Sequence, residues 1–149
     1  MCRVVSDRCA SNNECTISPI EKSFAVKIEY NRSAEPPAPF LDITVFDPAH
    51  PSERRIIPAK VDSAADITAL PASLVQALAL TQTHWLKVAG YDSQEAQIAV
   101  YDAAIEVAHV RAHIEVIAIP EDYALLGRDI LNQLRLLLDG PAHTLEILE

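Results

Sequence analysis

Glycine is scarce in this sequence: its 149 residues include three glycines. That number is too small for the glycine-rich loops that cradle phosphates or dinucleotides, and no such fingerprint is present. The G-x-S-x-G elbow of many serine hydrolases is also missing. These absences argue against a nucleotide-dependent enzyme and against a serine hydrolase of that type.

Basic residues are few as well, with 12 Lys and Arg against 21 Asp and Glu, a formal net charge of −9. Phosphate binding requires concentrated Lys and Arg, so we expect no nucleic-acid partner. No apolar run approaches the roughly 20 residues of a membrane span. The first 15 residues, MCRVVSDRCASNNEC, are too polar for a signal peptide. We therefore expect a cytoplasmic protein with no membrane partner.

Cysteine is confined to the start of the chain, at Cys2, Cys9 and Cys15. Their spacing matches no zinc pattern, and an odd number does not suit a disulfide framework. We expect reduced thiols on a loose arm, and the spacing does not favour the alternative of a metal or redox role. Residues 1–20 are interpreted as a flexible N-terminal arm, and residues 21–149 as one domain.

What the sequence does contain is alternation: half of its residues are hydrophobic, and many recur with a period of two. Strands are expected over residues 23–30, 40–48 and 55–62, a hairpin over 84–107 with a turn at 90–93, and a further hairpin around Gly140. Helical spacing is limited to residues 71–80 and 127–134. The pattern predicts a mainly β fold with one or two short helices.

Residues 105–119 alternate for longer than any other segment, which favours an antiparallel strand or a hairpin pair. We expect one face to carry Ile105, Val107, His109, Arg111, His113 and Glu115. His109 and His113 would be two pleats apart with Arg111 between them. That arrangement favours a solvated polar face over a metal site.

Carboxylates are the remaining candidates for chemistry. Asp62 closes the expected strand 55–62, where the chain leaves a sheet for a loop, and Ser63 places a hydroxyl beside it. A charged residue in an apolar run costs free energy unless something requires it. A second carboxylate, Asp66, follows four residues later.

Two motifs together make this signal specific. The first is Val61-Asp62-Ser63-Ala64-Ala65-Asp66, and the second is LLGRDIL at residues 125–131. The pair resembles the retropepsin-like aspartic proteases, which include the retroviral proteases and bacterial relatives. The resemblance spans Phe40 to Leu148 and implies a small closed β-barrel. The first 39 residues fall outside it, although residues 23–30 could add an outer strand.

The resemblance also implies roles for single residues. Asp62 would be the catalytic carboxylate, and the Ser63 hydroxyls would brace the two active-site loops against each other. Asp66 and Arg128 would form a partly buried ion pair between the loop and the C-terminal helix. The hairpin around Gly90 and Tyr91 would be the flap that covers the substrate.

An aspartic protease needs two carboxylates, and this chain has one such motif, since Asp92-Ser93 sits in a hairpin tip. One motif per chain implies a homodimer with the site on its two-fold axis. The aspartate pair would activate a water that hydrolyses a bond of a peptide or protein substrate. No metal and no cofactor are expected.

One position departs from the family pattern, because Ala64 stands where the family has glycine. Glycine permits unusual backbone angles and close approach by a ligand. Two functions therefore stay open. The first is an aspartic endopeptidase, favoured because Asp62 and Ser63 are both kept. The second is a catalytically weak or inactive dimer of the same fold that binds peptides or mediates interactions.

Overall fold

A computed structural model of the chain describes residues 26–89 and 95–148. The expected N-terminal arm with its cysteines lies outside these ranges, as do Gly90, Tyr91 and the Asp92-Ser93 tip. The described elements are β1 (Val26–Glu29), β2 (Phe40–Phe46), β3 (Arg55–Val61), β4 (Ala69–Pro71), α1 (Ala72–Ala77), β5 (Gln82–Ala89), β6 (Glu95–Val107), β7 (Val110–Ile119), β8 (Ala124–Leu126), α2 (Arg128–Leu131), β9 (Arg135–Asp139) and β10 (Thr144–Leu148).

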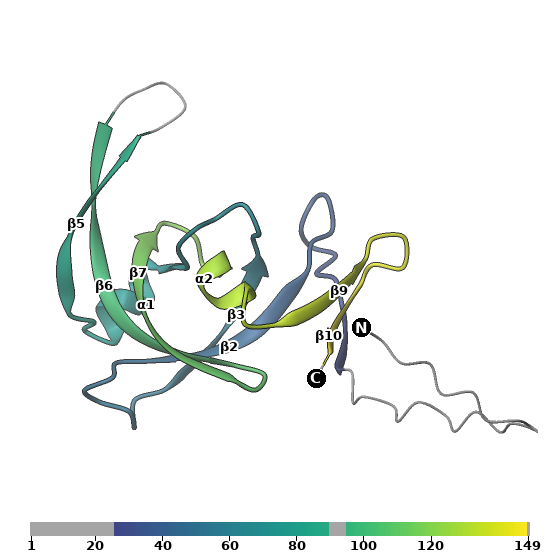
Figure 1. Cartoon of the computed structure of the whole chain (residues 1–149), viewed down its shortest axis with the longest axis horizontal. Coiled ribbons are helices and arrows are strands. Elements are labelled where there is room, and N and C mark those ends of the chain that lie inside the picture. Colours follow the sequence, from purple (N-terminus) through teal and green to yellow (C-terminus); the bar gives the residue numbers. More distant parts are fainter. Residues whose placement is uncertain (1–25, 90–94, 149) are drawn as a thin grey trace, which may run out of the picture.

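Six strands form a closed barrel. They pair in the order β2-β3-β8-β4-β7-β6, and β6 closes the ring by pairing with β2 (Figure 1). Two pairs are parallel, β3 with β8 and β4 with β7, and the other barrel pairs are antiparallel. The predicted mainly β closed barrel with short helices is confirmed.

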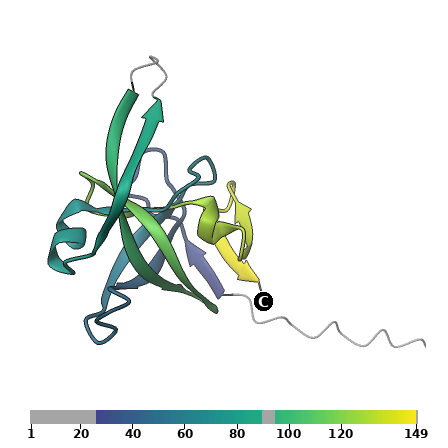
Figure 2. The same ribbon diagram turned by 60° about the vertical axis from the view of Figure 1, so that its left-hand side comes forward.

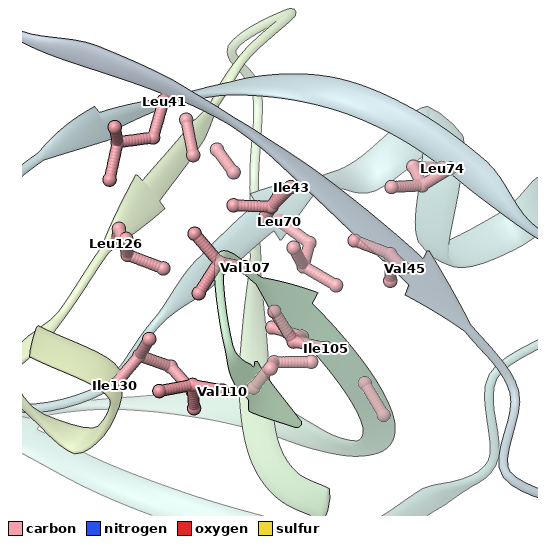
Figure 3. Close-up of a cluster of buried hydrophobic side chains, with 14 of the residues drawn as sticks. Leu41, Ile43, Val45, Leu70, Leu74, Ile105, Val107, Val110, Leu126 and Ile130 are labelled. Carbon is pink, nitrogen blue, oxygen red and sulfur yellow. The ribbon is translucent and has the colours of Figure 1, made fainter. Parts of the chain in front are cut away.

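The hydrophobic side chains that alternate along the strands fill the barrel. Leu41, Ile43 and Val45 of β2 are almost fully buried, as expected from their period of two. They meet Leu126 and Ile130, which flank the centre of the LLGRDIL motif (Figure 3). Burying one such side chain contributes about 1.5–3 kcal/mol. The core therefore fixes the elements on either side of the second motif's glycine.

The two helices are short, with six residues in α1 and four in α2. Pro71 is the N-cap of α1, as the sequence suggests, and Gly127 is the N-cap of α2. The α2 helix has four residues, which is fewer than the helical spacing over 127–134 predicts. No helix in the described ranges has the length and apolarity needed to cross a membrane.

Residues 105–119 form a hairpin, with a tight turn at Ala108 and His109 between β6 and β7. Ala108 has a φ of 50°, the left-handed conformation that such turns require. The two-residue turn shifts the alternation by one residue, so Val107 and Val110 are both buried. The predicted shared face was therefore wrong: Ile105 and Val107 point into the core, whereas Arg111, His113 and Glu115 are exposed.

The exposed side of this hairpin carries an ion pair and a side-chain hydrogen bond. Arg111 lies 3.3 Å from Glu106, and the His113 ring nitrogen lies 2.5 Å from an Asp102 oxygen. His109 sits in the turn itself. Among the described residues, no group of three or more His, Cys, Asp or Glu side chains is placed to hold a metal ion.

The turn between β2 and β3 contains a buried carboxylate. Asp47 accepts hydrogen bonds from the His50 ring at 2.8 Å and from the Ala49 backbone N–H at 3.0 Å. The His50 hydrogen bond is the main cause that lowers the pKa of Asp47, and the same bond raises the pKa of His50. The pair holds the β2–β3 connection in place far from the motifs discussed above.

A second, three-stranded sheet lies beside the barrel, with β10 between β1 and β9. Figures 1 and 2 both place it away from the β5–β6 hairpin and close to α2. The strand predicted at residues 23–30 is found over Val26–Glu29, and the turn predicted at Gly140 joins β9 to β10. Leu145 and Ile147 attach the sheet to the core.

Candidate active site

The loop of residues 62–68 leaves β3 and enters β4, and it starts at Asp62. Val61 pairs with Leu126 across the parallel β3–β8 ladder. The Asp62 backbone N–H continues that ladder, donating to the Leu126 carbonyl at 3.1 Å. A backbone hydrogen bond therefore joins the aspartate of the first motif to the second motif.

The Asp62 carboxylate is held by its own loop. Its Oδ1 accepts hydrogen bonds from the backbone N–H groups of Ala64 at 3.1 Å and Ala65 at 3.3 Å. The side chain stays partly accessible to solvent. A carboxylate that is fixed in direction and open on one side is suited to exchange protons with a bound molecule.

Ser63 and Ala64 are the exposed tip of this loop. In the described part of the chain, the non-glycine residues with positive φ are Ala79, Ala108 and His143. Ala64 is not among them, so the backbone at this position does not demand glycine. The methyl group of Ala64 can matter to a bound molecule, but it does not strain the loop.

Asp66 and Arg128 form an ion pair that links the loop to α2. Their side chains are 75% and 53% exposed, so the expectation of a partly buried pair was wrong. The exposure follows from position, since Asp66 lies on the outward side of the loop and Arg128 opens a helix at the surface. A backbone hydrogen bond runs alongside, from the Arg128 N–H to the Ala65 carbonyl at 2.9 Å.

A second side-chain connection between loop and helix is hidden. Asp129 accepts hydrogen bonds from the Thr68 N–H at 2.8 Å and from the Thr68 hydroxyl at 2.6 Å. The Thr68 oxygen in turn accepts from the Gly127 N–H at 3.1 Å, and Asp129 also accepts from the Ile130 N–H at 2.9 Å. Thr68 is fully buried. Its hydroxyl is thus satisfied both as a donor and as an acceptor.

Gly127 is required by close packing. A Cβ at this position would lie 2.8 Å from the Ile67 carbonyl carbon and 2.9 Å from the Thr68 nitrogen. Both are backbone atoms, which cannot rotate away. Here glycine serves close approach between two segments, not an unusual φ.

Thr68 is the site residue that sequence reasoning missed, and Asp129 appeared in the motif without a role. The available signal was a lone hydroxyl in the otherwise apolar run Ile67-Thr68-Ala69-Leu70. A polar residue in a buried run needs a partner, and a carboxylate at the start of a helix is one. The spacing from Asp62 alone does not identify that partner.

A pocket of about 520 Å³ lies against β3, and the residues that line it do not include those of the Asp62 loop. Its wall includes Lys60 of β3, two residues before Asp62, and Tyr123, which precedes β8. Tyr123 packs edge-on against Phe40, with ring centroids 5.4 Å apart. Glu35 and Asp122 add carboxylates to the rim. The pocket combines aromatic surface with charges of both signs.

The β5–β6 hairpin is present where the flap was expected. Its strands pair from Gln82 with Tyr101 to Ala89 with Glu95, and β6 continues into the barrel wall. In Figure 1 the hairpin extends from the barrel. The expected substrate contacts Gly90 and Tyr91 are outside the described residues, so their role stays a prediction.

Solved structures with a similar backbone include a retropepsin-like aspartic protease from Rickettsia conorii. It matches with a TM-score of 0.57 and 19% identity over 83% of this chain and 89% of that chain. A foamy viral protease-reverse transcriptase in complex with an RNA/DNA hybrid matches with a TM-score of 0.51 and 15% identity, over 66% of this chain and 12% of that one. The present chain thus corresponds to a small part of the viral chain.

No protein-family model matches the sequence, and no curated protein is significantly similar to it. At identities this low, a structural match demonstrates a common fold and leaves activity open.

Proposed function

Because the chain has the retropepsin-like fold, we propose that it is an aspartic endopeptidase that acts as a homodimer. The observation that carries the proposal is the Asp62 loop. Its carboxylate is oriented by two backbone N–H groups, and its first residue is bonded to the Leu126 carbonyl beside Gly127. Such a loop supports a fixed, accessible carboxylate on each of two chains.

Two carboxylates make the proposed chemistry possible. When Asp62 and the partner's Asp62 meet at a two-fold axis, both cannot be ionised cheaply, so the pair holds one proton. The ionised member removes a proton from a water, whose oxygen attacks the peptide carbonyl carbon. The protonated member donates to the carbonyl oxygen. Collapse of the tetrahedral intermediate, with a proton passed to the leaving nitrogen, gives a carboxylic acid and an amine.

The β5–β6 hairpin supports a peptide as the substrate, because it offers strand edges to which an extended peptide can add by backbone hydrogen bonds. A peptide substrate would therefore be bound by its backbone.

Ala64 supports a second candidate function. Its methyl group stands on the exposed tip of the loop, beside the Asp62 carboxylate. If that methyl excludes the substrate backbone, the dimer would bind peptides without cutting them. Cleavage and binding therefore need separate measurements.

The decisive experiment compares the parent protein with Asp62→Asn on a mixed peptide library. Asparagine keeps the shape of the side chain but cannot exchange the proton, so we expect cleavage to fall at least about a hundredfold. Asp42→Asn is the matched control, because Asp42 is an exposed aspartate on β2. Peptide binding is followed in parallel by fluorescence anisotropy.

Three outcomes separate the alternatives. Cleavage by the parent and the control but not by Asp62→Asn supports the endopeptidase. Peptide binding by all three proteins without cleavage supports the binding module. Equal cleavage by all three contradicts a catalytic Asp62.

A further inference from the structure

One large aromatic side chain lies outside the barrel core. Phe46, the last residue of β2, faces Ala104 of β6. The preceding pair of facing residues, Val45 and Ile105, points into the core. Because successive side chains of a strand alternate between its two faces, Phe46 points to the outer surface of the barrel. It is nevertheless only 1% exposed, so groups outside the core must cover it.

Two guanidinium groups cover the Phe46 ring. The guanidinium carbon of Arg54 lies 4.3 Å from the ring centre and that of Arg111 lies 5.3 Å from it. At these distances a cation is attracted to an aromatic face. The Glu106 carboxylate joins the two arginines, with one oxygen 2.6 Å from Arg54 and the other 3.3 Å from Arg111. The cluster holds two cations and one carboxylate, on a chain whose net charge is −9.

A pocket of about 420 Å³ opens beside this cluster. Phe46, Ala104 and His113 follow one another across β2, β6 and β7. The small methyl group of Ala104 therefore leaves a hollow between two larger side chains. Pro48 and Pro51, from the turn between β2 and β3, add to the wall. The pocket thus has an apolar wall and room for a residue of a bound peptide.

The charged or titratable side chains that line the pocket, within the described part of the chain, are Arg111 and His113, without a carboxylate. Two carboxylates near the pocket are already engaged, Glu106 by the arginines and Asp102 by the His113 ring at 2.5 Å. Arg111 is 63% exposed and meets Glu106 through Nε. Because a guanidinium carries five N–H donors, its terminal nitrogens can donate to the carboxylate of a ligand.

We propose that this pocket binds the C-terminal residue of a peptide chain, with the terminal carboxylate on Arg111 and an apolar side chain in the hollow over Ala104. The short separation favours a chain end, since Arg111 lies 5.3 Å from the centre of the Phe46 ring. A terminal residue carries its carboxylate and its side chain on one Cα. An internal aspartate or glutamate would need a second residue to supply the apolar group.

The pocket is separate from the Asp62 loop, so the proposal goes beyond the proposed function. The pocket lies near the start of β3, whereas Asp62 follows the end of that strand. Seven extended residues span roughly 20 Å. Figure 1 shows the turn between β2 and β3 at the lower left, away from α2. A short peptide can therefore fill the pocket without touching Asp62.

An NMR titration tests the site in the Asp62→Asn protein, where the proposed catalytic carboxylate cannot cut the probe. The probe is the pentapeptide Gly-Gly-Gly-Gly-Leu with a free carboxylate. We expect saturable shifts of the backbone amides of Ala104, Ala112 and His113, with a Kd of about 1 mM or lower. The same peptide with an amidated C-terminus lacks the carboxylate, and pentaglycine lacks the side chain. We expect at least about tenfold weaker binding of each.

Two variants remove one half of the pocket each. Arg111→Gln deletes the cation and Ala104→Leu fills the hollow, so each should raise the Kd of the probe at least about tenfold. Arg32→Gln is the matched control, because Arg32 is an exposed arginine that does not line the pocket. Thermal unfolding verifies that each variant is folded. If Ala104→Leu does not fold, Arg111→Gln alone decides.

Several outcomes would overturn the site. These are equal binding of the free and the amidated peptide, equal binding by Arg111→Gln and the control, and no saturable shift at about 10 mM peptide. The amidated peptide Gly-Gly-Leu-Asp-Gly distinguishes a chain end from an internal acidic residue. Binding of that peptide as tight as that of the probe would overturn the assignment to a C-terminus. None of these outcomes depends on peptide cleavage, so the site and the proposed endopeptidase can fail separately.

Discussion

Two side-chain connections join the Asp62 loop to α2, and they differ in environment. Asp66 and Arg128 meet at the surface with more than half of each side chain exposed. Thr68, two residues after Asp66, is hydrogen-bonded to Asp129, the residue after Arg128. This connection lies beneath the loop, where Thr68 has no exposed surface. The first connection is one ion pair, whereas the second is a set of hydrogen bonds that also includes Gly127.

The comparison shows that the charged pair most visible in the sequence motifs need not be the one that stabilises the loop. Exposed ion pairs typically contribute about 0–1 kcal/mol, because water and salt compete with them. Hydrogen bonds to a charged group away from water contribute about 1.5–3 kcal/mol. We therefore expect the Asp62 loop to depend on Thr68 and Asp129 more than on Asp66 and Arg128.

The largest loss of stability is expected for a substitution at Gly127, where the loop and α2 are in close contact. Gly127→Ala would place a methyl group against the Ile67 and Thr68 backbone, and we expect unfolding to be easier by about 3 kcal/mol. Gly140→Ala is the matched control, because a Cβ there meets nothing within 4 Å. Urea unfolding midpoints measure both variants. Equal midpoints would show that the loop and α2 can separate at little cost.

A smaller loss is expected for Thr68→Val, which keeps the shape of the side chain and removes its hydroxyl. The Gly127 N–H loses its acceptor and Asp129 loses a donor, at a cost of about 2 kcal/mol. Thr44→Val, on the outer side of β2, serves as the control. A Thr68→Val protein as stable as the parent would show that the buried hydrogen bonds do not stabilise the loop.

Arg128→Met tests the exposed connection. Methionine keeps part of the side-chain length without the charge, and we expect a loss of about 1 kcal/mol or less that shrinks further in high salt. Thermal unfolding at low and high ionic strength gives the result. A loss larger than that of Thr68→Val would reverse the ranking of the two connections.

The smallest effect on stability is expected at Ala64, on the side of the loop that neither connection holds. Ala64→Gly increases the freedom of the unfolded chain and should cost about 0.5 kcal/mol. If the methyl group crowds a bound peptide backbone, kcat/KM should rise at the same time. Side-by-side unfolding curves and kinetics on a peptide library measure both. Unchanged kinetics would show that the methyl group does not touch the substrate.

Long alternating segments made most of the barrel predictable. The register of inward residues in β2 and the presence of both short helices follow from the sequence pattern. The strands β4 and β8 were not predicted, because three residues show no period. The face of β7 was misassigned because a two-residue turn is shorter than the window over which alternation can be judged.

The site was predictable where its residues stand next to each other in the sequence. Asp62 could be selected because a charge interrupts an apolar run, and the pairing of Asp66 with Arg128 came from the resemblance. Their exposure could not be foreseen, since it depends on which side of the loop faces the barrel. Thr68 was missed because its partners, Gly127 and Asp129, approach it only through the pairing of β4 with β8.

The pairing of β8 with both β3 and β4 also dictates when the site can form. Strand β8 stands between β3 and β4 in the ring, so the barrel cannot close until the chain has been made as far as Leu126. A nascent chain that ends at β7 already contains Asp62 but lacks the carbonyl and the glycine that fix its loop. Pairings so distant in sequence form late in folding. Whatever chemistry Asp62 performs is therefore withheld until synthesis has passed the second motif.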